Sequence, residues 1–341
     1  MDNMQVSSTD TTLLDALTVK GVLVSVTVRY WRARKKLNPE DLGLRKEQVN
    51  DRLISLGHKR LLPKESMEAL ARIEGRAHAL VEENSFPFLN GVARYLPNER
   101  IEDVTGKLED LKAQFEMEKR TFMQKYAELR DQALSEWRQT AQHLVSDPSR
   151  LVRVIENEFP SPHRMDRYFS FDIQLFQVTV PEMPQTQLVD AGTAREIAQA
   201  RQQAAQEARQ RIEHSCDEFI QECVQEMRKQ TSELCSDMIE TINGKGYVHQ
   251  KTLNRLIRFI DHFKQLNFMD DRQMEQQLEN TRQQFLTRTA EEYRDSTQAQ
   301  SELVDGLSTL RDYAGKLAHQ DATELVEGFG QQGRRKFSLA A

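Results

Sequence analysis

Hydrophobic side chains recur at steps of three and four residues along a long stretch in the first half of the chain. This spacing puts them on one helical face and predicts a single amphipathic helix of about forty-five residues, roughly 65 Å long. A helix of that length needs a partner that covers its apolar face. The positions that define the face are Ile101, Val104, Leu108, Leu111, Phe115, Phe122, Tyr126, Leu129, Ala133, Trp137, Ala141 and Leu144.

A second stretch with the same spacing begins at Thr193 and ends near Ile242. The segment between the two stretches is too short to return the chain for parallel packing. We therefore predict an antiparallel, coiled-coil-like arm in which the face around Phe115 packs against the face around Phe219. The first turns of the second stretch are rich in Ala, Gln, Arg and Glu, so we expect that end of the arm to be thin and mobile.

Alternation with a period of two residues predicts two strands. One lies near residues 22–31, where Val22, Val24, Val26 and Val28 share a face, and the other lies near residues 168–180. A strand is not stable alone, so the two pair either with each other or with a strand of another chain. We expect them to pair within the chain.

These elements predict a mainly α protein, with a long antiparallel coiled-coil-like helical arm and a small β element. Residues 1–100 form an N-terminal α/β region, and residues 101–242 form a long helical hairpin with a strand-containing insertion at 146–189. C-terminal helices follow over residues 243–330, and residues 331–341 are a flexible tail.

Composition and charge narrow the class of function. The chain of 341 residues has a formal net charge of -6, so no overall positive field attracts nucleic acid or an anionic membrane. No run of about 18 apolar residues occurs, and residues 1–10 are polar, which leads us to expect a cytoplasmic protein without a membrane span. Cys216, Cys223 and Cys235 share one predicted helix, and we expect reduced thiols that pack in the core.

No residue spacing in the sequence is typical of an enzyme active site, a metal centre or a cofactor cradle. The pair Gly244-Lys245 lies between two predicted helices and not after a strand, which favours a helix cap over a phosphate-binding loop. The eight histidines show no H-x-x-x-H spacing, and the cysteines no C-x-x-C spacing. We therefore predict no enzymatic activity, no cofactor and no metal site.

The sharpest local feature is the segment RYWRARKK, in which five cations are interleaved with two aromatic residues. Cations and aromatic rings in this pattern can grip phosphates and stack on bases. The alternative is a solvent-facing strand end, since the acidic residues Glu40 and Asp41 follow closely. The candidate contact residues here are Arg29, Trp31, Arg32, Arg34, Lys35 and Lys36.

A second basic cluster lies near the end of the chain, at Arg334, Arg335 and Lys336, next to the aromatic Phe337. Such a cluster on a flexible end fits a docking peptide for an acidic pocket on a partner. A solubilising tail explains it equally well.

The sequence resembles a family of proteins of unknown function, DUF3150, which occurs in phages, plasmids and integrative conjugative elements. The specific part of the resemblance is its opening signature, and the remainder covers most of the chain. The matching positions are Trp31, Lys35-Lys36-Leu37, Pro39-Glu40-Asp41-Leu42-Gly43, Leu56-Gly57 with Lys59, the Gly91 loop ending at Pro97, and Phe169-Ser170-Phe171.

What the resemblance implies is a set of partners. Genes of this family often neighbour a MoxR-type AAA+ ATPase and a protein with a von Willebrand factor A domain. We therefore expect a non-enzymatic scaffold or adaptor of a mobile genetic element. Two rivals remain: an accessory protein that binds single-stranded nucleic acid through residues 29–36, and a self-assembling structural coiled coil.

Overall fold

The computed structural model describes residues 11–45, 47, 49–50, 52–89, 91–177, 192–320 and 322–337. This part of the chain is mainly helical with a small sheet, which confirms the predicted fold class. Two of its helices are much longer than the rest, as the spacing of apolar residues predicts. No helix in the described ranges is both long enough and apolar enough to cross a membrane.

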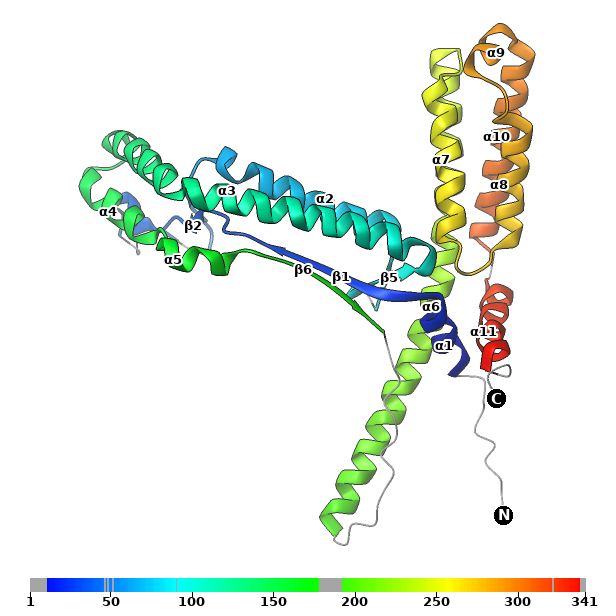
Figure 1. The fold of residues 1–341 in the computed structure, drawn as a ribbon, viewed down its shortest axis with the longest axis horizontal. Coiled ribbons are helices and arrows are strands. Elements are labelled where there is room, and N and C mark those ends of the chain that lie inside the picture. Colours follow the sequence, from blue (N-terminus) through cyan, green and yellow to red (C-terminus); the bar gives the residue numbers. More distant parts are fainter. Residues whose placement is uncertain are drawn as a thin grey trace. The chain divides into compact units, whose positions relative to one another are not determined.

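The helices and strands follow one another in a mixed order (Figure 1). The α-helices are α1 (Thr11–Lys20), α2 (Glu68–Asn84), α3 (Asn98–Leu144), α4 (Pro148–Glu158), α5 (Pro162–Met165), α6 (Gly192–Lys245), α7 (Gln250–Leu266), α8 (Arg272–Phe285), α9 (Ala290–Asp295), α10 (Thr297–Ala318) and α11 (Thr323–Phe337). The strands are β1 (Gly21–Arg29), β2 (Arg34–Lys36), β3 (His58–Arg60), β4 (Phe86–Phe88), β5 (Ala93–Pro97) and β6 (Ser170–Phe176). Short 3-10 helices are η1 (Pro39–Leu42), η3 (Lys64–Met67) and η4 (Asp166–Tyr168).

The chain folds into two compact units, each assembled from separate segments. Unit 1 comprises residues 1–24, 84–102 and 175–341, and unit 2 comprises residues 25–83 and 103–174. The chain therefore passes from one unit to the other four times, within β1, α2, α3 and β6. This division differs from the four consecutive regions that the sequence suggested.

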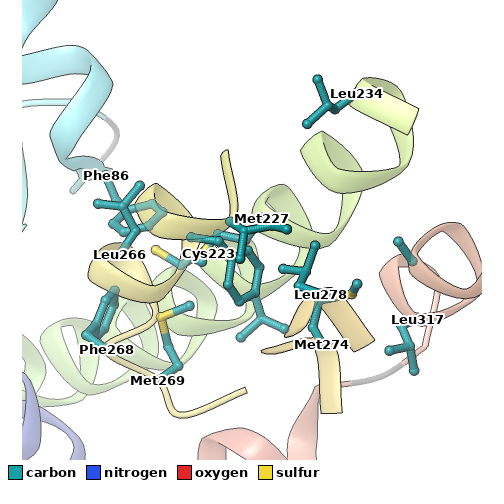
Figure 2. Packing of buried hydrophobic residues seen from close by; sticks show 14 of the residues in the cluster. Phe86, Cys223, Met227, Leu234, Leu266, Phe268, Met269, Met274, Leu278 and Leu317 are labelled. Atoms are coloured by element: carbon teal, nitrogen blue, oxygen red, sulfur yellow. The ribbon is translucent and has the colours of Figure 1, made fainter. Parts of the chain in front are cut away.

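The core of unit 1 is built on α6. Helix α10 packs along α6, and α8 packs against both α7 and α10 (Figure 1). Apolar side chains from these helices meet in one cluster, in which Cys223, Met227 and Leu278 lie together (Figure 2). The capped start of α7 and the Asp271 cap of α8 fix where these helices begin.

The larger sheet has the strand order β4-β5-β1-β6. Strands β1 and β6 are the two that alternation predicts. They are hydrogen-bonded neighbours in this sheet, which confirms that they pair within the chain. The hairpin β4–β5 lies in a segment where Pro87, Gly91 and Pro97 favour a loop. Gly21 of β1 faces Pro97 of β5, and a Cβ at Gly21 would lie 2.5 Å from the Leu96 carbonyl oxygen, so only glycine fits this approach.

The core of unit 2 is rich in aromatic rings. Trp31 lies between Phe122, Tyr126 and Phe159, with ring centroids 5.8 to 6.3 Å apart. Tyr126 also donates a 2.6 Å hydrogen bond to the carbonyl oxygen of Pro160. These contacts attach α3 to the segment that follows α4.

The apolar faces of α3 and α6 have partners other than the predicted ones. On α3, Phe115 contacts the rings of Phe169 and Phe171, which flank the start of β6. On α6, Phe219 contacts the ring of Phe88 on β4, 4.8 Å away between centroids. The predicted hairpin, in which these two faces cover each other, is thereby corrected: each face is filled from within its own unit. Periodicity identifies the buried face of a helix but not the element that covers it.

Candidate functional site

The segment of residues 29–36 divides into buried aromatic residues and exposed cations. Tyr30 and Trp31 are only 8% and 6% exposed, and the Trp31 ring is enclosed by the aromatic core of unit 2. The predicted role of Trp31 as a stacking platform is therefore wrong, since no base could reach its face. The strand ends at Arg29, so these two aromatic residues follow it and turn into the core.

Arg32 is exposed, but its charge is already neutralised. Its guanidinium forms a bidentate ion pair with Glu74 of α2, with N–O distances of 2.9 and 2.5 Å, and lies over the Tyr30 ring at 4.1 Å. The hydrogen bonds that Arg32 donates to Glu74 raise the pKa of Arg32 above its usual value. Burial, together with Glu74, raises the pKa of the Tyr30 hydroxyl. Arg32 therefore serves mainly to attach this segment to α2.

The remaining cations lie on a two-stranded ribbon. Ala33 adopts a positive φ of 49°, which turns the chain out of the core and into β2. Strand β2 pairs antiparallel with β3, with Arg34 opposite Arg60, Lys35 opposite Lys59 and Lys36 opposite His58. Five of these six basic residues are exposed, and Lys59 is buried. The structure thus joins the predicted residues Arg34 and Lys36 to two basic residues that the sequence interpretation missed, His58 and Arg60.

Lys59 is the centre of a buried ionic cluster beneath the ribbon. Its Nζ lies 2.6 Å from Asp41 Oδ2 and 2.9 Å from Glu158 Oε1, and its side chain is 1% exposed. Asp41 also accepts a 2.9 Å hydrogen bond from the backbone N–H of Asn38, which caps η1. One ammonium group therefore links β3, η1 and α4. The indole Nε1 of Trp137 donates to the Arg60 carbonyl oxygen at 3.0 Å, which attaches the same ribbon to α3.

The C-terminal cluster belongs to unit 1, whereas the ribbon belongs to unit 2. Helix α11 continues through Phe337, so the prediction of a flexible tail from residue 331 is corrected over residues 331–337. The backbone of Arg334, Arg335, Lys336 and Phe337 lies in this helix, and their side chains are outside the described part of the chain. Residues 338–341 are likewise outside the described residues, as are 178–180 of the predicted second strand and 178–189 of the predicted insertion.

The three thiols of unit 1 are buried and free, which confirms the expectation of reduced packing residues. Burial raises the pKa of Cys216 and of Cys235 from 9.0 to about 12, and raises the pKa of Cys223 well above its usual range. Only the thiolate reacts with alkylating reagents, so we expect native Cys216 and Cys235 to react with iodoacetamide at pH 8 about a thousandfold more slowly than an ordinary thiol. Mass spectrometry after timed quenching measures these rates.

Urea-unfolded protein provides the control, because its three thiols should react at the rate of a model peptide. Fast labelling of the native protein would contradict the buried placement.

The raised pKa values of the thiols also affect the stability of the protein. Between pH 9 and about 12 the unfolded chain loses thiol protons that the folded chain retains, so the free energy of unfolding should fall as pH rises through this range.

The described ranges offer few other candidate binding sites. They contain no group of three or more His, Cys, Asp or Glu side chains that could hold a metal ion. A pocket in unit 1, between α1 and the start of β1, is lined mainly by apolar side chains such as Leu14, Leu17 and Phe88. Gln177 contributes one of its few polar side chains.

Comparison with known proteins places the chain in a family. A family model described as "Protein of unknown function (DUF3150)" matches residues 18–312. The chain belongs to the DUF3150 family. No curated protein and no solved structure matches it. The DUF3150 description assigns no function to the family.

Proposed function

We propose that this DUF3150 protein is a non-enzymatic scaffold or adaptor of a mobile genetic element. As its partners we propose a MoxR-type AAA+ ATPase and a protein with a von Willebrand factor A domain, which the family resemblance implies. The observation that carries the proposal is the first part of α6. It is a long helical segment in which no described side chain is fully buried and only Ile212, near its end, packs against the core.

This segment, residues 192–215, is called the stem. Helix α6 begins at Gly192, and among the side chains that the structure describes along it, the first buried one is Cys216. Twenty-four helical residues span about 36 Å, so the stem extends well beyond the core of its own unit. Its described side chains are exposed or half-buried, and pairs one turn apart, such as Arg211 with Glu207 at 3.1 Å, support the helix. A polar helix with this exposure is typical of a segment that bridges between domains, and we infer that the stem bridges to a partner.

The buried ionic groups support the same proposal. In unit 1, Arg228 on α6 pairs with Asp271 at 2.7 Å and donates to the Leu317 carbonyl oxygen at 3.0 Å. In unit 2, Lys59 is held between two carboxylates. Both clusters connect elements of the fold, and this is the role of a structural ion pair.

Co-purification with the two proposed partners tests the function. The DUF3150 protein is co-expressed with the ATPase and the von Willebrand factor A protein, and the mass of the purified complex is measured by size-exclusion chromatography with light scattering. We expect a stable complex that contains at least one partner. A DUF3150 protein that elutes alone beside both partners at micromolar concentration contradicts the proposal.

A charge-insertion variant tests the role of the stem. Ala200→Glu with Ala204→Glu changes two exposed positions one turn apart, and we expect it to weaken the complex at least tenfold. Gln276→Glu with Asn280→Glu adds the same charge to exposed positions of α8 and should leave the complex intact. Equal effects of the two variants would show that the stem is not part of the interface.

A self-assembling coiled coil remains the rival structural function. Light scattering of the lone chain separates the two, because a scaffold that needs its partners stays at low mass. Masses that grow with protein concentration favour the rival.

A further inference from the structure

The charge of the chain is unevenly distributed around the ribbon β2–β3. Residues 29–60 contain ten Lys or Arg residues and four Asp or Glu residues, in a chain whose net charge is -6. Among these cations, Arg32 and Lys59 are paired with carboxylates. The local excess of positive charge therefore falls on the exposed side chains of the segment, including those of the ribbon.

The register of the ribbon shows which cations share a face. Backbone hydrogen bonds join Leu61 N to Ala33 O at 2.7 Å and Leu37 N to Gly57 O at 3.1 Å, and they extend the ladder at both ends. In an antiparallel pair these positions alternate with non-hydrogen-bonded ones, where opposite side chains lie closest. Arg34 with Arg60, and Lys36 with His58, occupy those closer positions.

Because side chains alternate across a strand, these four residues lie on the face opposite to buried Lys59. All four are exposed, and within the described part of the chain none forms an ion pair. Like charges directly opposite each other destabilise a strand pair. Arg34 lies directly opposite Arg60, so the outward face, defined as Arg34, Lys36, His58 and Arg60, carries at this pair a repulsion that a bound polyanion would relieve.

We propose that this outward face binds the phosphate backbone of duplex nucleic acid. A two-stranded ribbon has dimensions that the major groove admits, and cations spaced along both strands match a repeating row of phosphates. The exposed apolar residues Leu53 and Ile54 lie in the segment between the two strands and not on the paired strands themselves. Burial of Tyr30 and Trp31 removes the stacking surfaces that single-stranded bases require.

Fluorescence anisotropy of a labelled 25-base-pair duplex of random sequence tests the proposal. If three permanent cations contact phosphates, the protein should bind the duplex about 40-fold more weakly at 200 mM than at 50 mM NaCl. The variant Arg34→Gln with Lys36→Gln and Arg60→Gln should lower the slope of log affinity against log salt by about 3. Lys36→Gln alone should lower it by about 1.

Matched controls make the result decisive. Lys245→Gln with Lys251→Gln and Arg258→Gln removes three exposed cations from unit 1, and the duplex affinity should stay within about twofold of the wild type. Circular dichroism checks that both triple variants are folded. An equal loss of duplex affinity in the two triple variants would show that the effect depends on net charge alone, which would overturn the proposal.

Three further outcomes would also overturn it. One is the absence of duplex binding at 50 mM NaCl with tens of micromolar protein. Another is tighter binding of single-stranded DNA of the same length. The third is binding to phosphatidylcholine vesicles that contain phosphatidylserine, lost on the same substitutions, without any binding to the duplex.

Discussion

The substitution Arg228→Met is expected to lower the free energy of unfolding of unit 1 by about 3 to 5 kcal/mol. The side chains of Arg228 and Asp271 are 4% and 3% exposed, and their N–O distance is 2.7 Å. Methionine would leave the Asp271 carboxylate buried without its cation and would also remove the donor to the Leu317 carbonyl oxygen. All three cysteines lie in unit 1, so pulsed thiol labelling at increasing urea concentration follows this unit.

An exposed pair provides the control for this substitution. Arg255 pairs with Asp237 at 3.0 Å, but the two side chains are 52% and 58% exposed. Arg255→Met should therefore cost at most about 1 kcal/mol. The double variant Arg228→Met with Asp271→Asn should recover part of the loss, because the amide oxygen can still accept from the N–H of Met274. Equal losses for Arg228→Met and Arg255→Met would contradict the importance of burial.

Lys59→Met is expected to destabilise unit 2 by a similar amount, about 3 to 5 kcal/mol. Without the ammonium group, the carboxylates of Asp41 and Glu158 remain close together with no cation between them. The links from β3 to η1 and α4 are lost at the same time. The two tryptophans of the chain, Trp31 and Trp137, both lie in unit 2, so tryptophan fluorescence during urea unfolding follows this unit.

Lys35→Met is the matched control, because Lys35 lies directly opposite Lys59 in the ribbon and is exposed. It should change the unfolding free energy by less than about 0.5 kcal/mol. Neutralising both acids in the Lys59→Met background, by Asp41→Asn and Glu158→Gln, should restore part of the stability. If Lys59→Met unfolds at the urea concentration of the wild type, the buried cluster does not stabilise unit 2.

Local patterns in the sequence predict the long helices and the two main strands. The recurrence of apolar residues at three and four positions identifies α3 and the buried part of α6, and alternation identifies β1 and β6. These signals succeed because each arises within one element. The sequence patterns do not predict the hairpin β4–β5, since Pro87 and Gly91 favour turns and its pairing with β1 joins residues seventy or more positions apart.

Sequence patterns predict less well which residues at the site contact each other and which of them are buried. Trp31 lies among the five basic residues of segment 29–36 and appears in sequence as a surface ring, yet it is enclosed by Phe122, Tyr126 and Phe159. The pattern of three basic residues His58, Lys59 and Arg60 gives no sign that the middle one is buried. The pairing of β2 with β3 decides this, because alternation across the strand turns Lys59 toward the two acids.

The passage of the chain between units within β1, α2, α3 and β6 has a consequence for genetics. An N-terminal deletion that extends past residue 24 takes part of β1 from each unit, and a premature stop codon before residue 175 removes most of unit 1 together with part of unit 2. Truncated alleles would therefore resemble null alleles wherever they end in this region. Missense alleles that alter one exposed face, such as the stem or the ribbon, are the ones whose phenotypes can separate the activities of this protein.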